Sequence, residues 1–247
     1  MSRGTPIAVF RPDDDRLAEA VSLLESLGVV PVADPMLAVE PTGVSPREDC
    51  EYTILTSKTG VELAANEGWT PAGEVCVIGN RTARALREAG YEVDLVPEEF
   101  SSVGLVRALE DTVGGAHIEV ARSDHGSEVL TDGLNDAGAY VHETVLYRLT
   151  RPPEAGVSVE KAAHGELDGA LFTSSLTVNH FLASAEERGL RENVVAGLSS
   201  SVVGAIGEPT KATAESQGIA VDVVPETASF EEFAREVAER ASSNENN

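Results

Sequence analysis

The sequence repeats one stretch of itself, and this repeat constrains the fold more than any other feature. Residues 75–86 (VCVIGNRTARAL) have a second version at 202–213 (VVGAIGEPTKAT). In both, a β-branched apolar run ends in Ile-Gly, and a Thr follows three residues after the Gly. At a constant offset of 128 the match continues through the pairs Gly79/Gly207, Gly90/Gly218, Val93/Val221, Val96/Val224, Pro97/Pro225 and Ser101/Ser229. A match kept over so many turn and strand positions indicates an internal duplication.

The repeat unit predicts a strand, a tight turn and a helix. A short apolar run is typical of a buried strand in a parallel sheet. The Gly after it lets the backbone turn sharply or approach a ligand, and we expect Thr82 and Thr210 to cap the helices that follow. The free N–H groups at such a helix start can bind an anion, although a plain turn without a ligand is the better explanation of a single copy. Two copies favour two similar sheets with a cleft between them.

Length and charge bound the class of protein. A chain of 247 residues is long enough for two domains of about 100–120 residues, and the repeat favours two. The net charge is −24, which excludes nucleic acid and anionic membranes as expected partners. Because the acidic residues are spread along the chain, the composition predicts the solvated surface of a salt-adapted protein.

The cysteines and the hydrophobic pattern favour a reducing compartment. Cys50 and Cys76 stand alone, without a CxxC motif, so no structural disulfide is expected. No apolar run approaches 18 residues, and the N-terminus lacks a signal-peptide pattern. We therefore expect a cytoplasmic protein, and a monomer.

Strands alternate with helices along the chain, which predicts an α/β fold with parallel sheets. The pattern includes a strand at 92–96, a long alternating strand at 140–149, a final helix at 230–240 and a frayed tail at 242–247. No strand–helix–strand unit directly precedes the second copy of the repeat. Residues 1–35 contain such a unit, and it is not part of the first copy. We predict one discontinuous domain (1–35 with 154–247), an inserted domain (41–148) and two linker strands between them (36–40 and 149–153).

The candidate functional groups of this chain are hydroxyls, amides and a few cationic side chains at predicted strand ends. The five histidines show no ligand spacing, so no metal is expected, and the chain has no P-loop, GxGxxG or G-x-S-x-G motif. In open α/β sheets the carboxyl ends of the strands face the binding crevice. The candidate binding residues there are Arg11, Thr56, Ser57, Gly79, Asn80, Thr82, Ser101, Arg122, Ser123, Thr173, Ser174, Gly207, Thr210 and Ser229.

Each candidate also has a purely structural interpretation. Any Ser or Thr at these positions can be a helix cap. Arg11 and Arg122 can pair with carboxylates on so acidic a surface. Tyr147 can pack inside the protein, or its phenol can give a proton to a leaving group.

Taken together, these motifs resemble the uroporphyrinogen-III synthase family over nearly the whole chain. The resemblance rests on the segments 9–12 (VFRP), 55–57 (LTS), 77–83 (VIGNRTA), 121–123 (ARS), 145–148 (VLYR), 172–174 (FTS) and 206–210 (IGEPT). It implies two α/β domains joined by a two-stranded linker, one of them discontinuous. One departure is Glu208, a carboxylate in the second Ile-Gly motif, which in the family usually reads Gly-Pro-Thr-Thr.

The resemblance also implies a reaction. The substrate would be hydroxymethylbilane, which loses its terminal hydroxyl, closes through a spiro intermediate and emerges with its last ring inverted, without metal or cofactor. Tyr147 corresponds to the family's tyrosine, proposed to help the hydroxyl leave, and the hydroxyls and amides above would hold the substrate's carboxylates. A two-domain binding protein or sensor without catalysis remains the main alternative, and an enzyme for a nucleotide or phosphate on the same scaffold is another.

Overall fold

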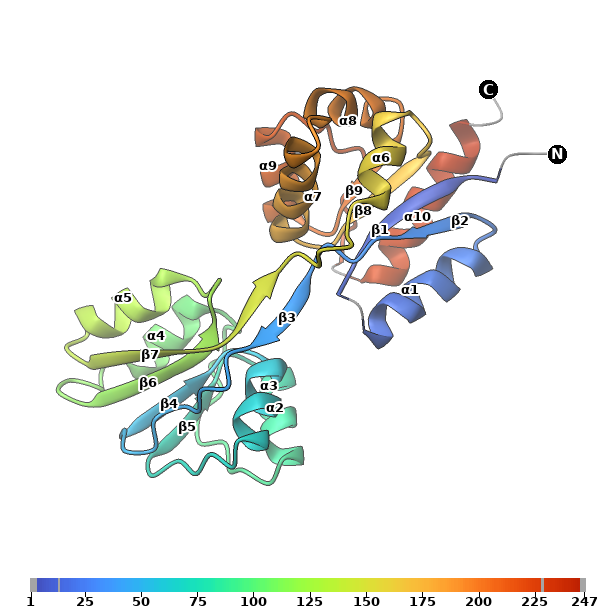
Figure 1. The fold of residues 1–247 in the computed structure, drawn as a ribbon. Helices are drawn as coiled ribbons and strands as arrows, with labels where there is room; N and C mark the ends of the chain where they lie inside the picture. Colours follow the sequence, from blue (N-terminus) through green and yellow to red (C-terminus); the bar gives the residue numbers. More distant parts are fainter. Residues whose placement is uncertain (1–3, 13, 228, 245–247) are drawn as a thin grey trace. The chain divides into compact units, whose positions relative to one another are not determined.

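The chain divides into two compact units, each with its own parallel sheet. The structure, a computed structural model, describes residues 4–12, 14–227 and 229–244. One unit, here called the terminal unit, contains the described residues up to Ala38 and from Thr150 onward. The other, the inserted unit, runs from Val39 to Leu149. Figure 1 shows the inserted unit in light blue to yellow-green and the terminal unit in the colours of both chain ends.

The terminal unit is built on a four-stranded sheet in the order β2-β1-β8-β9. Its strands are β2 (Val30–Ala33), β1 (Pro6–Phe10), β8 (Gly169–Phe172) and β9 (Val202–Ala205). Every neighbouring pair is parallel, so the first strand of the chain lies beside a strand about 160 residues later, with Phe10 opposite Phe172. Strands β8 and β9 are buried along their whole length, because helices cover both faces of the sheet.

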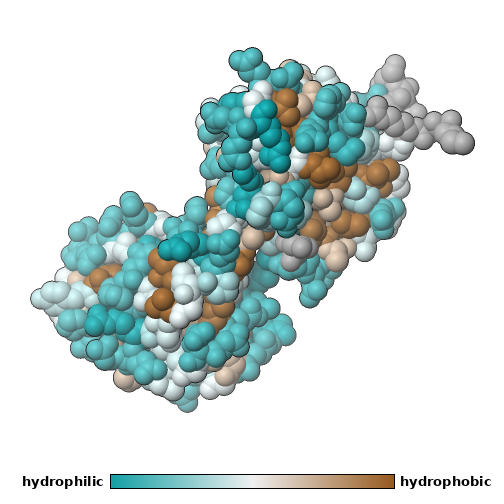
Figure 2. Space-filling view, in the orientation of Figure 1, coloured by the Kyte–Doolittle hydropathy of each residue, from teal (hydrophilic) through white to brown (hydrophobic). Residues whose placement is uncertain are grey.

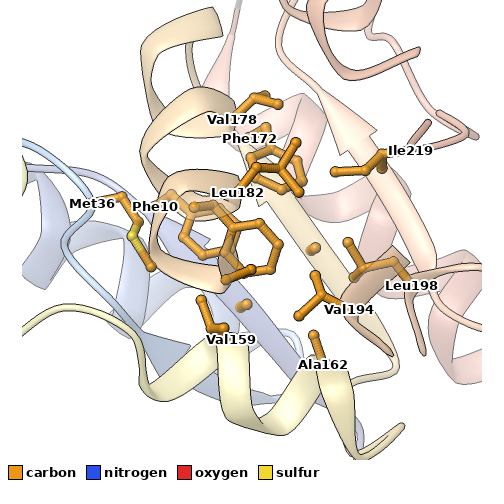
Figure 3. Packing of buried hydrophobic residues seen from close by; sticks show 14 of the residues in the cluster. Phe10, Met36, Val159, Ala162, Phe172, Val178, Leu182, Val194, Leu198 and Ile219 are labelled. Atoms are coloured by element: carbon orange, nitrogen blue, oxygen red, sulfur yellow. The ribbon is translucent and has the colours of Figure 1, made fainter. Parts of the chain in front are cut away.

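Helices pack on both faces of this sheet (Figure 1). On one face lie α1 (Asp15–Ser26) and α10 (Phe230–Asn244), whose buried residues share a cluster with Val9 and Leu171. On the other lie α6 (Val157–Ala163), α7 (Ser175–Glu187), α8 (Arg191–Leu198) and α9 (Glu208–Ser216). Figure 3 shows the core of this second face, where the rings of Phe10 and Phe172 stack with centroids 4.6 Å apart.

The inserted unit has a five-stranded sheet in the order β3-β7-β6-β4-β5. The strands are β3 (Ala38–Pro41), β7 (Tyr140–Thr150), β6 (His117–Ser123), β4 (Tyr52–Leu55) and β5 (Glu74–Val77). Helices α2 (Lys58–Asn66) and α3 (Asn80–Glu88) cover one face, and α4 (Ser102–Leu109) and α5 (Glu128–Asp136) cover the other (Figure 1). The predicted fold class, α/β with parallel sheets, is confirmed.

The sequence repeat is also a structural repeat. At the offset of 128 residues, β5 corresponds to β9 and α3 to α9, and Gly90 and Gly218 both adopt a left-handed backbone, with φ of 92° and 89°. Both copies continue into an extended segment that joins the sheet by a single bridge, Cys76 to Leu95 and Gly204 to Val223. The predicted strand at 92–96 is therefore wrong in extent, because only one residue of it pairs with the sheet.

One aspartate fixes that extended segment in each copy. The backbone N–H of Val75 donates to Oδ2 of Asp94 at 2.7 Å, and the N–H of Val203 donates to Oδ2 of Asp222 at 2.8 Å. The segments lie beside β5 and β9, which are edge strands, so an outward N–H of these strands faces no further strand of the sheet. The side chain therefore replaces a missing ladder partner.

Two elements depart from the sequence prediction. Helix α8 was not predicted, and it accounts for the longer spacing between the strand ends of the second copy, 33 residues from Ser174 to Gly207 against 22 from Ser57 to Gly79. The predicted tail at 242–247 is also wrong in part, because α10 continues to Asn244. Residues 245–247 lie outside the described residues.

Figure 2 shows one face of each unit, on which hydrophilic residues in teal cover much of the surface and hydrophobic residues in brown gather in patches. Among the described helices, none combines the length and the apolar character needed to cross a bilayer.

Candidate functional site

The carboxyl ends of the inserted unit's strands bring two predicted site residues into contact. Tyr147 lies near the end of β7, and Ser57 follows the end of β4. The phenol of Tyr147 donates to Oγ of Ser57 at 2.9 Å. The ring is 6% exposed and belongs to the core cluster beneath α2 and α3, whereas Ser57 is only half-buried. Two residues 90 positions apart thus form one hydroxyl pair.

A register shift in the sheet aims Tyr147 at Ser57. Strands β6 and β7 pair evenly up to Arg122 opposite Val145, and then Ser123 lies opposite Tyr147, so Leu146 is an extra residue. Side chains alternate between the faces of a strand, and an extra residue reverses that alternation. Tyr147 therefore points to the face covered by α2, where Ser57 lies.

Ser57 also begins a helix. Its Oγ accepts the backbone N–H of Gly60 at 2.9 Å, which is the N-cap contact of α2. A Cβ on Gly60 would lie 3.1 Å from this oxygen, so the glycine leaves room for the hydroxyl pair. Thr56, the neighbouring candidate, is half-buried between β4 and this cap.

The start of α3 offers backbone amides rather than a capping hydroxyl. Gly79 is the N-cap residue and α3 begins at Asn80, so the prediction that Thr82 caps this helix is wrong. Thr82 is the third residue of the helix, within its first turn, and is 4% exposed. A Cβ on Gly79 would lie 3.2 Å from Cβ of Phe100, so the loop before α4 packs closely on this turn. Asn80, in contrast, is exposed.

Ser101 lies in that same loop as the N-cap of α4. Its Oγ accepts the N–H of Gly104 at 3.0 Å and donates to Glu99 at 2.8 Å. The half-buried hydroxyl thus already has two partners within its own loop.

Arg122 is held inside the unit. Its side chain is 5% exposed, and its Nε and Nη2 donate to the two carboxylate oxygens of Glu143 at 3.0 and 2.9 Å. Its Nη1 donates to the carbonyl of Ser127 at 2.6 Å. Arg122 therefore has the structural role considered above, an ion pair with a carboxylate. Its contact with Ser127 also holds the loop that follows β6. Ser123, next to it, is half-buried at the end of that strand.

The loop after β6 carries an Asp–His pair that the sequence did not single out. Asp124 contacts Nδ1 of His125 at 2.8 Å and accepts the N–H of Leu149 at 3.0 Å. Partial burial favours the neutral acid, but the hydrogen bonds from His125 and Leu149 hold the pKa of Asp124 below its usual value. Asp124 thereby ties the loop to β7 just beyond Tyr147.

The terminal unit has equivalent strand ends with different contacts. Ser174 caps α7 by accepting the N–H of Thr177 at 3.2 Å, and Thr177 returns the contact to complete a capping box. Thr173 donates to the carbonyl of Phe10 at 2.6 Å. The guanidinium of Arg11 stacks over the ring of Phe230, 4.0 Å from its centroid. These three strand-end residues, Ser174, Thr173 and Arg11, thus make structural contacts in the terminal unit.

The second Ile-Gly turn differs from the first in charge. Gly207 is the N-cap of α9, and Glu208 is the first residue of that helix. Thr210 is 4% exposed within α9, so the prediction that it caps the helix is wrong for the same reason as for Thr82. A carboxylate in the first turn already complements the positive end of this helix. Ser229, just before α10, is exposed.

Neither cysteine is suited to nucleophilic chemistry. Burial, together with the nearby charges of Glu74 and Asp94, raises the pKa of Cys76 to about 12. Burial and the charge of Glu119 also raise the pKa of Cys50. Within residues 4–12, 14–227 and 229–244, no three His, Cys, Asp or Glu side chains are grouped so that they could hold a metal ion.

Comparisons with known proteins agree on one family. The sequence pattern of uroporphyrinogen-III synthase HemD matches residues 17–235. A protein of Methanothermobacter thermautotrophicus, provisionally designated uroporphyrinogen-III synthase, is 34% identical over 237 residues, which cover 89% of this chain and 92% of that one. The uroporphyrinogen-III synthase of Synechococcus elongatus is 30% identical over 178 residues, 68% of this chain and 66% of its own.

Solved structures show the same fold. A mutant uroporphyrinogen III synthase of Thermus thermophilus aligns with a TM-score of 0.68 at 20% identity, over 97% of this chain and 99% of its own. Uroporphyrinogen-III synthetase of Helicobacter pylori aligns with a TM-score of 0.61 at 16% identity, over 97% of this chain and 99% of its own. The family match spans both units, and one relative exceeds 30% identity over most of its length. The chain belongs to the uroporphyrinogen-III synthase family.

Proposed function

We propose that this protein is an enzyme that converts hydroxymethylbilane to uroporphyrinogen III, with loss of water and inversion of ring D. The observation that carries the proposal is the family match over residues 17–235, which includes every candidate site residue except Arg11. The named relatives and the structural neighbours support the same activity, a cyclising lyase in porphyrin biosynthesis. A binding protein without catalysis is not favoured by any of these comparisons.

The reaction requires the protein mainly to position the substrate. When the terminal hydroxyl leaves as water, the substrate becomes an electrophilic azafulvene, and the far pyrrole attacks it at the substituted carbon to give the spiro intermediate. Holding a flexible chain in that geometry raises the rate of one closure over another. Tyr147 is the residue that assists departure of the hydroxyl, directly or through Ser57, because its phenol lies at a strand end within the hydroxyl pair with Ser57.

The substrate carboxylates need donors, and the two units offer different ones. In the inserted unit the candidates are the backbone amides at Gly79 and Asn80 and the hydroxyls of Thr56, Ser57, Ser101 and Ser123. In the terminal unit they are Arg11, Thr173, Ser174, Gly207 and Ser229. Arg122, Thr82 and Thr210 are buried, so their contribution would be to hold these turns in place.

The acidity of the chain bears on the conditions of catalysis. A net charge of −24 repels a substrate that carries eight carboxylates, and only screening removes that repulsion. Near 1 M salt the Debye length is about 3 Å, so only contacts within the site act on the substrate. The proposal is a monomeric, cytoplasmic enzyme of a salt-rich cell, whose turnover rises from dilute buffer to molar KCl. Full activity and stability in dilute buffer would contradict the salt-adapted part of the proposal.

The isomer formed from hydroxymethylbilane tests the activity. The folded protein in molar KCl is expected to yield uroporphyrinogen III, while buffer alone yields the head-to-tail isomer I. Formation of isomer I only, by protein shown to be folded from its circular dichroism, would reject the synthase function. Binding of the substrate without turnover would then favour the binding-protein alternative.

A further inference from the structure

The hydroxyl pair of the inserted unit is arranged as a chain rather than as a single acid. Tyr147 is 6% exposed, and its phenol is already bound to Oγ of Ser57. Ser57 is half-buried and follows the strand end directly. Of the two hydroxyls, that of Ser57 is therefore the one a substrate can reach.

The donors and acceptors in this pair have one consistent assignment. The N–H of Gly60 can only donate, so it takes one lone pair of the Ser57 oxygen at 2.9 Å. A phenol is a stronger acid and a weaker acceptor than an aliphatic alcohol, so Tyr147 donates to Ser57 rather than the reverse. The Ser57 oxygen then accepts two hydrogen bonds, and its own proton is left to point away from both donors.

Two accepted hydrogen bonds also prepare Ser57 to transfer that proton. Hydrogen bonds in a chain polarise one another, so each donor strengthens the next. Gly60 fixes the geometry, because it has no Cβ that would crowd the serine oxygen at 3.1 Å. The register shift at Ser123 and Tyr147 brings the phenol to the same face.

We propose that Ser57 is the catalytic residue that gives its proton to the leaving hydroxyl of the substrate, and that Tyr147 is a positioning residue that replaces this proton. The inference rests on the proposed function. In the step, the substrate C–O bond breaks with its electron pair on oxygen, the Ser57 proton joins that oxygen to form water, and the Tyr147 proton passes to the Ser57 oxygen. The substrate pyrrole supplies the electrons that stabilise the cation left behind. After ring closure, the proton lost from the new pyrrole carbon returns along the same path to Tyr147.

The relay predicts a specific pattern among variants in single-turnover experiments with excess enzyme. Tyr147→Phe and Ser57→Ala are each expected to slow the formation of uroporphyrinogen III by about 100-fold. The double variant should be no slower than the slower single variant, because the two groups act as one unit. Ser57→Thr retains a hydroxyl and a cap, so it should recover the rate to within a few-fold.

Two further variants separate proton transfer from helix capping. Ser57→Asn can still accept the Gly60 N–H, but it has no acidic hydroxyl, so it should remain as stable as wild type and as slow as Ser57→Ala. Ser127→Ala removes the matched N-cap of α5 in the same unit, where Ser127 Oγ accepts the Val129 N–H at 3.3 Å. Ser127→Ala should lose about as much stability as Ser57→Ala, as measured by the fluorescence of Trp69 during unfolding. It should keep the wild-type rate.

The solvent isotope effect gives a readout that a structural role would not change. The rate in mixtures of H2O and D2O should fall along a curve if two protons move together, and along a straight line if one moves. A linear dependence for the wild type, full turnover by Ser57→Asn, or a double variant whose loss is the product of the single losses would each overturn the relay. Failure of the wild type to form any uroporphyrinogen III would instead reject the proposed function itself, so the two failures are distinguishable.

Discussion

The two copies of the repeat fill the same layer of their cores with different pairs of residues. In the inserted unit, Cys76 of β5 and Leu105 of α4 share a buried cluster. At the offset of 128 the terminal unit has Gly204 of β9 and Phe233 of α10. A Cβ on Gly204 would lie 2.4 Å from Cε2 of Phe233. The smaller strand residue therefore accompanies the larger helix residue, and the duplication has kept the volume of the layer rather than its side chains.

The strand ends differ between the copies in their chemistry. Ser57 and Ser174 both cap a helix, but the residue three positions later is Gly60 in one unit and Thr177 in the other. The Ser174 Oγ accepts the Thr177 N–H, and the Thr177 Oγ accepts the Ser174 N–H, which completes a capping box. The Ser57 Oγ accepts the Gly60 N–H in the same way and also accepts the phenol of Tyr147. The capping hydroxyl of Ser174 is thus combined with a capping box, and that of Ser57 with a hydroxyl pair at a strand end.

The compensation of volume between the two core positions can be tested by substituting the residue of one copy into the other. Gly204→Cys places the inserted unit's residue in β9 against Phe233 and Val237, and it should destabilise the protein by about 3 kcal/mol through overpacking. Adding Phe233→Leu reproduces the pair of the inserted unit and should recover about 1–2 kcal/mol. Denaturant unfolding followed by circular dichroism measures both. A loss that Phe233→Leu leaves unchanged would contradict compensation between the two positions.

The activity comparison depends on the room beside Ser57. In Gly60→Ala the new methyl group would lie 3.1 Å from the serine oxygen and 3.4 Å from Leu146, so the hydroxyl must shift. Helix propensity favours Ala, which should leave the free energy of unfolding almost unchanged, while turnover falls roughly tenfold because small displacements of reacting groups are costly. Gly133→Ala is not a suitable control, because its Cβ would meet Val106 at 2.7 Å. The suitable control is Thr59→Ala in the first turn of α2, and equal turnover in Gly60→Ala and Thr59→Ala would show that the space is not needed.

The equivalent aspartates, Asp94 and Asp222, test whether the two copies hold their extended segments in the same way. Asp94→Ala and Asp222→Ala each leave an N–H of an edge strand without its side-chain partner, and each should cost about 1 kcal/mol. The Asn variants retain an acceptor and should recover most of the loss. Equilibrium unfolding in denaturant measures the four variants. A clear cost at one position and none at the other would mean that the two segments are not held in the same way.

The repeat made much of this fold predictable from the sequence. The constant offset located β5 with α3 and β9 with α9, and the apolar runs located the remaining buried strands, because parallel strands covered on both faces are apolar throughout. The equivalent roles of Asp94 and Asp222 could also have been predicted from the repeat, since both copies carry an Asp after the aligned valine. Helix α8 was harder to predict, because it has no equivalent in the first copy.

The candidate site was less predictable because its geometry depends on tertiary contacts. Thr82 and Thr210 have the spacing of helix caps, but each helix begins directly after its glycine, which places both threonines inside the first turn. The contact of Tyr147 with Ser57 depends on the extra residue in β7, and an alternating sequence pattern does not reveal such a shift. The burial of Arg122 depends on Glu143 from the neighbouring strand, which the sequence alone does not place beside it.

The smallest expected effect is a pH dependence confined to the loop beside Tyr147. Since the pKa of Asp124 is lower in the folded protein than in the unfolded chain, its ionised form stabilises the fold above the unfolded pKa of about 4, and this contribution is lost as the pH falls through the folded pKa. Asp124→Asn should therefore be less stable than wild type at pH 7 and equally stable near pH 2, measured by denaturant unfolding with Trp69 fluorescence as the reporter of the inserted unit. Asp132→Asn, an exposed position on α5, serves as the control and should follow the wild type at every pH. A stability difference between Asp124→Asn and wild type that stays constant from pH 7 to pH 2 would show that the charge of Asp124 is not what holds the loop to β7.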